Sequence, residues 1–198
     1  MDKLNKLQDI LAGGNATHGG AYPAGGHRAD ESDDDWNRAA EHASHHAGDS
    51  GDASLFSTML GALSHKKQKL ADEDIDEEEA VRTHKKYFSD EGDDRHEADD
   101  RSMGSAAAMQ ALKMFVGGQS GNTSQSSSQS AFVGLAMAEA SKLFDKQASQ
   151  GKVSSDSSKE SAVMQAGEMA LKMYMKSQGG GSSGSGASGL MSLASKFL

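Results

Sequence analysis

Apolar residues recur three and four positions apart along several segments of this 198-residue chain, which is typical of amphipathic helices. In the C-terminal half this spacing predicts helices over residues 105–116, 130–150, 158–177 and 189–198. Shorter helices are predicted over residues 2–11, 35–46 and 53–64, and a further helix begins at Asp74. No segment alternates apolar and polar residues as a half-buried strand does. The pattern therefore predicts an all-α protein.

The C-terminal half contains a diverged internal duplication. Ala-Leu-Lys-Met-Phe at residues 111–115 returns as Ala-Leu-Lys-Met-Tyr at 170–174, and Ala-Ser-Lys-Leu-Phe at 140–144 returns as Ala-Ser-Lys-Phe-Leu at 194–198. A Gly/Ser tract separates the two motifs in each copy, so the repeated unit is a helix, a linker and a helix. Because each such hairpin needs a neighbour to cover its apolar face, the duplication predicts an antiparallel helix bundle of two related hairpins.

Helix ends and polar faces can be predicted from the same pattern. Asp52 is the expected N-cap of the helix over 53–64, and Asp74 with Glu77 forms a capping-box pattern. Ser157 with Glu160 makes the same pattern before the helix over 158–177. On the helix over 130–150 we expect Glu139 on the polar side. Five methionines are expected in the core, where they fill gaps between alanines: Met109, Met114, Met169, Met173 and Met175.

Charge and composition divide the chain into three predicted regions. The first 104 residues hold 12 Lys and Arg against 24 Asp and Glu, and the remaining 94 hold 8 against 5. We expect a low-order region with short helices over 1–52, an acidic helical region and linker over 53–103, and the duplicated bundle over 104–198. Four segments that are rich in Gly, Ser or Asp are expected to be disordered or linkers, at residues 13–34, 90–103, 118–128 and 179–186.

Composition also argues against several classes of function. The chain has no cysteine, which rules out disulfides and thiol chemistry, and no apolar run approaches the length that spans a bilayer. A net charge of −9 disfavours nucleic acid. Three motif matches lack their structural context: a G-x-G-x-x-G at 184–189, a G-x-S-x-G at 180–184, and an EF-hand-like start at Asp72. We therefore expect no enzyme activity, no cofactor and no small-molecule substrate, in an intracellular protein of the cytoplasm or the nucleus.

One cluster of residues has the chemistry of a metal site. His42 and His46 lie one helical turn apart, a spacing that can chelate a divalent ion, with Glu41 and His45 beside them. The order differs from the H-E-x-x-H pattern of zinc proteases, so it places no general base. The alternative interpretation is a solvent-exposed helix end, where histidines suit the helix dipole.

Several blocks of the sequence resemble a known family. These blocks lie at residues 42–48, 72–77, 80–82, 104–115, 173–180 and 189–198. They resemble a small family of fungal proteins of unknown function, some of which carry the label "beta-flanking protein". The similarity spans roughly residues 40–198. It implies a fungal intracellular protein, and it carries over neither an activity nor a functional residue.

These patterns favour a non-enzymatic intracellular helical interaction or structural protein. Long Gly/Ser linkers between repeated helices would let hairpins exchange between chains, so we expect a protein partner or self-association. One alternative is a divalent-metal-binding protein that uses His42, His45 and His46. A second is a peripheral membrane-surface protein that uses amphipathic helices at 2–11 and 189–198, although the acidic N-terminal half opposes approach to anionic lipid.

Overall fold

Six α-helices are present in the part of the chain that the computed structural model describes, which is residues 27–89, 97–117, 129–179 and 195. They are α2 (His27–Ala47), α3 (Ala53–Ala71), α4 (Glu77–Phe88), α5 (Asp100–Val116), α6 (Gln129–Ser149) and α7 (Lys159–Gly179), with a 3₁₀ turn, η1 (Gly48–Ser50). Within these residues there is no strand, and one isolated bridge joins Ala98 to Val153. The predicted all-α class is confirmed.

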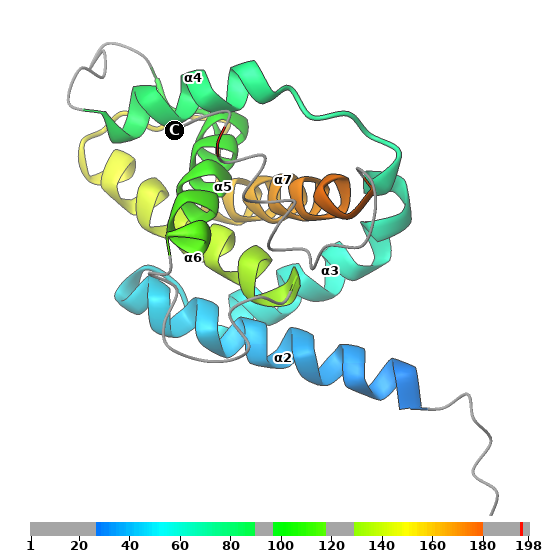
Figure 1. Cartoon of the computed structure of the whole chain (residues 1–198). Coiled ribbons are helices and arrows are strands. Elements are labelled where there is room, and N and C mark those ends of the chain that lie inside the picture. Colours follow the sequence, from blue (N-terminus) through cyan, green and yellow to red (C-terminus); the bar gives the residue numbers. More distant parts are fainter. Residues whose placement is uncertain (1–26, 90–96, 118–128, 180–194, 196–198) are drawn as a thin grey trace, which may run out of the picture. The chain divides into compact units, whose positions relative to one another are not determined.

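The centre of the fold is formed by α5, α6 and α7, each of which packs against the other two (Figure 1). Around them, α3 packs on α7 and α4 packs on α5. Every side chain of α6 from Phe132 to Ser141 is buried. A helix that is buried on all sides in this way is the middle of a bundle rather than its surface. Residues 32–198 form one compact unit that holds all these contacts.

The duplicated motifs occupy equivalent positions in this core. Ala111 and Leu112 of α5 are buried, and so are Ala170 and Leu171 of α7. Because α5 and α7 pack on each other, the first motif of each repeat faces the same apolar interior. The second motif of the first copy lies on α6, where Leu143 is buried. Its counterpart at 194–198 lies outside the described residues except for Ser195, as do the predicted helices at 2–11 and 189–198.

Small residues bring the helix backbones into close contact. A Cβ atom at Gly134 of α6 would lie 2.8 Å from the carbonyl oxygen of Ala39, so α2 runs directly against α6 there. A Cβ atom at Gly104 of α5 would lie 2.8 Å from the backbone nitrogen of Ala166 on α7. Both distances are shorter than any normal Cβ contact, and the opposing atoms belong to the backbone. These two crossings therefore require glycine.

Two predicted caps are wrong, and a tertiary contact explains each. The N-cap of α4 is Asp76, not Asp74, and its side chain accepts a bond from the backbone N–H of Glu79. The chain stays non-helical before that point because Ile75 is buried in the core. The N-cap of α7 is Ser158, whose side-chain hydroxyl accepts a hydrogen bond from the backbone N–H of Ser161. The hydroxyl of Ser157 instead accepts a hydrogen bond from the backbone N–H of Asp100 on α5. The predicted Asp52 cap of α3 is confirmed.

Residues 97–103 form an ordered part of the fold, although the sequence predicts a linker over 90–103. Ala98 exchanges backbone hydrogen bonds with Lys152 and Ser154, and Asp99 caps α5 by accepting from the N–H of Ser102. Met103 is fully buried. One buried methionine and one alanine therefore anchor a segment whose composition is otherwise polar. Helix α2 also begins earlier than expected, at His27 instead of Asp35. The three predicted domain boundaries stay predictions.

The close crossing of α2 and α6 predicts a specific effect of adding one methyl group. Gly134→Ala should destabilise the protein by about 1–3 kcal/mol, because the new Cβ atom forces the backbone of Ala39 away. The midpoint of urea or thermal unfolding measures this change.

Gly61→Ala on α3 is the matched control, because a Cβ atom there has no neighbour within 4 Å. It should stabilise the protein by about 0.4–1 kcal/mol by lowering the entropy of the unfolded chain. Equal effects of the two substitutions would contradict the proposed close contact.

Candidate functional site

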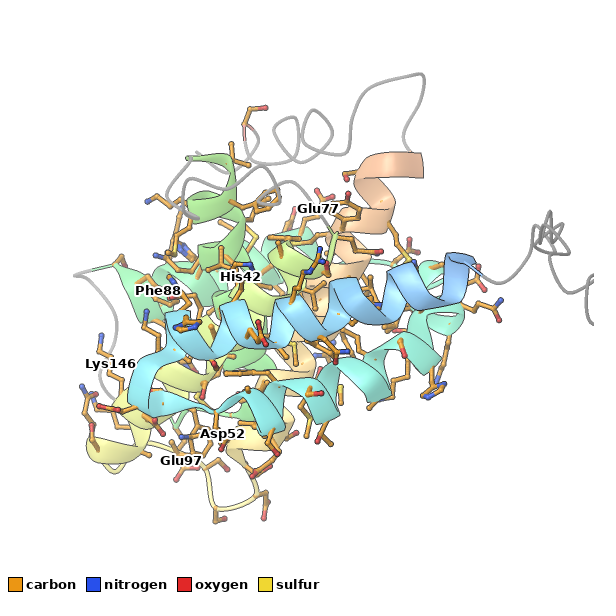
Figure 2. The ribbon with its side chains drawn as sticks, turned by 90° about the horizontal axis from the view of Figure 1, so that it is seen from below. His42, Asp52, Glu77, Phe88, Glu97 and Lys146 are labelled. Carbon is orange, nitrogen blue, oxygen red and sulfur yellow. The ribbon has the colours of Figure 1, made fainter. Side chains whose placement is uncertain are left out.

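The candidate metal ligands lie on the last turns of α2 and do not converge. Glu41, His42 and His45 are exposed, and Figure 2 shows His42 on this helix. His46 turns to the neighbouring helix instead, with its Nε2 atom 2.8 Å from the Oε1 atom of Glu139 on α6. Among the described residues, no group of three or more His, Asp or Glu side chains is placed to hold a metal ion. Metal binding at this cluster stays a prediction of the sequence, and the contact of His46 with Glu139 counts against it.

Glu139 is a charged residue in the core, where the sequence predicts a polar surface position. Its side chain is 8% exposed, and its Oε1 atom also accepts a hydrogen bond from Lys142 Nζ at 3.0 Å. Because an ionised carboxylate has no proton to give, Nε2 of His46 is the donor. Burial alone would raise the pKa of Glu139, but the bonds from His46 and Lys142 outweigh it and the pKa is lowered. This contact joins α2 to α6 and has a structural role.

A second buried polar network joins α4 to the start of α5. The Tyr87 hydroxyl lies 2.7 Å from Ser102 Oγ, which in turn donates to Asp99 Oδ2 at 2.9 Å. Ser102 uses its single hydrogen for Asp99, so Tyr87 donates to Ser102. Burial raises the pKa of the Tyr87 hydroxyl, which keeps it neutral and available as a donor. The arrangement contains no histidine base and holds two helices together.

A third polar pair joins the same two helices. His84 Nε2 is 2.9 Å from Gln110 Oε1, and the imidazole ring stacks on Phe88 with ring centroids 5.1 Å apart. Burial lowers the pKa of His84, with a smaller contribution from Lys113, so the ring is neutral at pH 7. Neutral His84 donates Nε2–H to Gln110, which fixes its tautomer. The contact joins α4 to α5.

A further candidate site is a hollow of about 320 Å³ within residues 32–198. The loop before α4, the first turn of α4, and the facing sides of α5 and α7 enclose it. Its lining residues are Glu73, Asp74, Ile75, Asp76, Glu79, Arg101, Ser105, Gln165, Glu168, Met169 and Lys172. Figure 1 shows the segment between α3 and α4 running past the C-terminal end of α7 on its way to α4. Three separate parts of the chain, residues 73–79, 101–105 and 165–172, therefore meet at one polar cavity.

Two ion pairs hold the walls of this hollow together. Lys172 Nζ of α7 lies 2.5 Å from Glu73 Oε2 of the loop, and this bond lowers the pKa of Glu73. Lys66 Nζ of α3 lies 2.7 Å from Glu168 Oε1 of α7. Each pair joins segments that are far apart in the sequence. The loop and α3 are thereby both fastened to α7.

The sequence gives little signal for the hollow. It draws attention to Asp72, Asp74 and Asp76 as an EF-hand-like start, but Asp76 serves as a helix cap. Arg101 falls in a segment expected to be a linker, and Gln165 and Lys172 come from a helix expected only to pack. A single carboxylate-rich run could have suggested one wall. The other walls depend on helix packing, which spacing alone does not reveal.

Comparison with known proteins matches part of the chain to a family. Residues 35–120, less than half of the chain, match a domain of unknown function (DUF7721). No curated protein matches the chain. No solved structure matches it either. The resemblance to fungal beta-flanking proteins stays a prediction. Among the described residues, no helix is both long and apolar enough to cross a membrane.

The buried position of Glu139 predicts a pH-dependent stability. Glu139→Gln should destabilise the protein near pH 7 by about 1–3 kcal/mol, because two charge-assisted hydrogen bonds are weakened. The pKa of Glu139 is lower in the folded state than its ordinary value of 4.5, so its contribution is present above that pH. The contribution is lost as the pH falls through the lower folded-state pKa. Urea unfolding across this pH range should therefore show the two proteins converging in acid.

Glu160→Gln, an exposed change on the first turn of α7, is the control for this experiment. It should alter stability by no more than about half a kcal/mol. A difference between wild type and Glu139→Gln that stays constant down to acidic pH would contradict the assigned role of the Glu139 charge.

The family match predicts that its own segment does not fold alone. Residues 35–120 contain α3 and α5, whose buried faces pack on α7, and they contain neither α6 nor α7. The isolated segment should therefore show little cooperative unfolding by circular dichroism. Adding the separate segment 121–198 should restore helicity and a cooperative transition. A cooperative transition of the isolated segment 35–120 would show that the central helices are dispensable.

Proposed function

We propose that this protein is a non-enzymatic helical interaction protein, and that it binds another protein chain at the hollow beside α4, α5 and α7. The observation that carries this proposal is the different use of polar groups inside the protein and at the hollow. Inside, the polar groups of Glu139, Tyr87 and Ser141 are each bonded to another element of the fold. At the hollow, Arg101, Asp74 and Glu79 form no ion pair with any described residue. Accessible charges without partners are available for intermolecular contacts.

The lining of the hollow supports binding over catalysis. Among the lining residues, Ser105 carries the hydroxyl group that could act as a nucleophile. The lining includes no histidine that could activate this hydroxyl. Three of the five lining carboxylates already have structural partners: Asp76 caps α4, and Glu73 and Glu168 form ion pairs with Lys172 and Lys66. A nucleophile requires a base within hydrogen-bonding reach, and among the described residues no lining carboxylate is hydrogen-bonded to the Ser105 hydroxyl.

Self-association is one form that this interaction can take. The two helices of each repeated hairpin are joined by a Gly/Ser tract, which would allow a helix of one chain to replace its equivalent in another. The absence of cysteine in the whole sequence fits an intracellular protein, and the acidic net charge of −9 disfavours nucleic acid as the partner.

A site-specific crosslinking experiment tests this function. A photoreactive amino acid at position 101, which is exposed and lines the hollow, should capture a discrete partner in cells that naturally produce the protein. The same group at position 62, exposed on α3 and outside the hollow, is the control. Mass spectrometry identifies the crosslinked species.

We expect a band specific to position 101, at the mass of two chains if the protein self-associates and at another mass if it binds a different protein. Identical products from the two positions would contradict the proposed function. A single-chain mass by light scattering over a wide concentration range would remove self-association.

A further inference from the structure

The hollow carries an excess of negative charge after its internal ion pairs are taken into account. Its lining contains five carboxylates, namely Glu73, Asp74, Asp76, Glu79 and Glu168, and two cations, Arg101 and Lys172. Lys172 is bonded to Glu73, and Lys66 from α3 is bonded to Glu168. Three carboxylates therefore remain against the single guanidinium of Arg101. A cavity with this balance attracts cations and repels anions.

The shape and the apolar part of the hollow select among cationic ligands. Ile75 is buried at its wall and Met169 is partly buried, so an aliphatic chain can lie on apolar surface while its charged end meets a carboxylate. The volume of about 320 Å³ exceeds that of one side chain. A bare divalent ion is a poorer fit, because no described group of three acidic or histidine residues is placed around one point.

From this charge balance and shape we infer that the hollow binds a basic peptide segment of the partner protein, with lysine or arginine side chains directed at Asp74 and Glu79. The inference rests on the proposed function and adds the chemistry of the partner. The walls are already held by the Lys172–Glu73 and Lys66–Glu168 pairs, so binding requires little reorganisation. Arg101 is the one lining cation without a bonded carboxylate, and it opposes a basic ligand.

Asp74 and Glu79 are negatively charged and Arg101 is positively charged, so removing either kind of charge should change the affinity for a basic peptide in opposite directions. Fluorescence anisotropy at low salt should show that the full chain binds labelled hexalysine more tightly than the same peptide with acetylated lysines. Asp74→Asn combined with Glu79→Gln should weaken hexalysine binding about threefold to tenfold, as expected for the loss of two exposed charge pairs. Arg101→Ala should strengthen it about twofold to fivefold, because a repulsive charge is removed.

The control removes two charges elsewhere on the same chain. Asp156→Asn combined with Glu160→Gln changes exposed residues outside the hollow and should alter hexalysine affinity less than about twofold. Thermal unfolding verifies that all variants fold. Equal weakening by the two double variants would overturn the inference, because it would show attraction to net charge alone. An unchanged or weaker affinity of Arg101→Ala would also overturn it.

The outcome separates this inference from the proposed function. If hexalysine fails to bind while crosslinking from position 101 still captures a specific partner, the basic chemistry is wrong and the interaction function stands. If the hexalysine affinities change as expected, the captured partner should also have a lysine- or arginine-rich segment at the residue that is crosslinked to position 101. That result would support the inference.

Discussion

Close contact between helix backbones is the constraint on which this fold depends. The chain has few large aliphatic residues, so side-chain volume alone cannot fill the space between its helices. Alanine and glycine solve this by bringing the helices together until backbone atoms themselves form the packed surface. Gly134 against Ala39 and Gly104 against Ala166 are the tightest of these contacts between elements. The central position of α6 follows, because a helix rich in small residues can be surrounded on every side.

Tight packing of this kind imposes a second requirement on polar groups, because water cannot reach them. In the described residues, every buried side-chain nitrogen or oxygen has a hydrogen-bond partner. Several of these bonds join different elements, such as Tyr87 to Ser102 and Ser141 to the carbonyl oxygen of Ser50. These bonds fix the relative positions of helices whose small apolar side chains would otherwise allow more than one packing arrangement. The buried charge of Glu139 fits this pattern, since it fixes α2 against α6 at one position.

The sequence predicts the helices well where the apolar spacing is long and regular. The expected helix over 130–150 is observed as Gln129–Ser149, and that over 158–177 as Lys159–Gly179. It fails where a distant residue decides the local structure. Ser157 is diverted from its predicted cap by Asp100, and the polar run after residue 96 is ordered because Ala98 pairs with residues beyond α6. The hollow belongs to the same class, because three segments that are separate in the sequence build it.

The extent of the family match bears on where function can reside. The matched residues 35–120 supply the loop, α4 and α5 sides of the hollow, with Asp74, Glu79 and Arg101 among them. The remaining wall comes from α7, which lies outside the match and provides Lys172 and Glu168. Those two residues form the ion pairs that fasten the loop and α3 in place. The unpaired charges thus lie within the shared segment, whereas the groups that hold them in position lie beyond it. A protein that shares only the matched segment can present the same charges at one surface only if other helices replace α6 and α7.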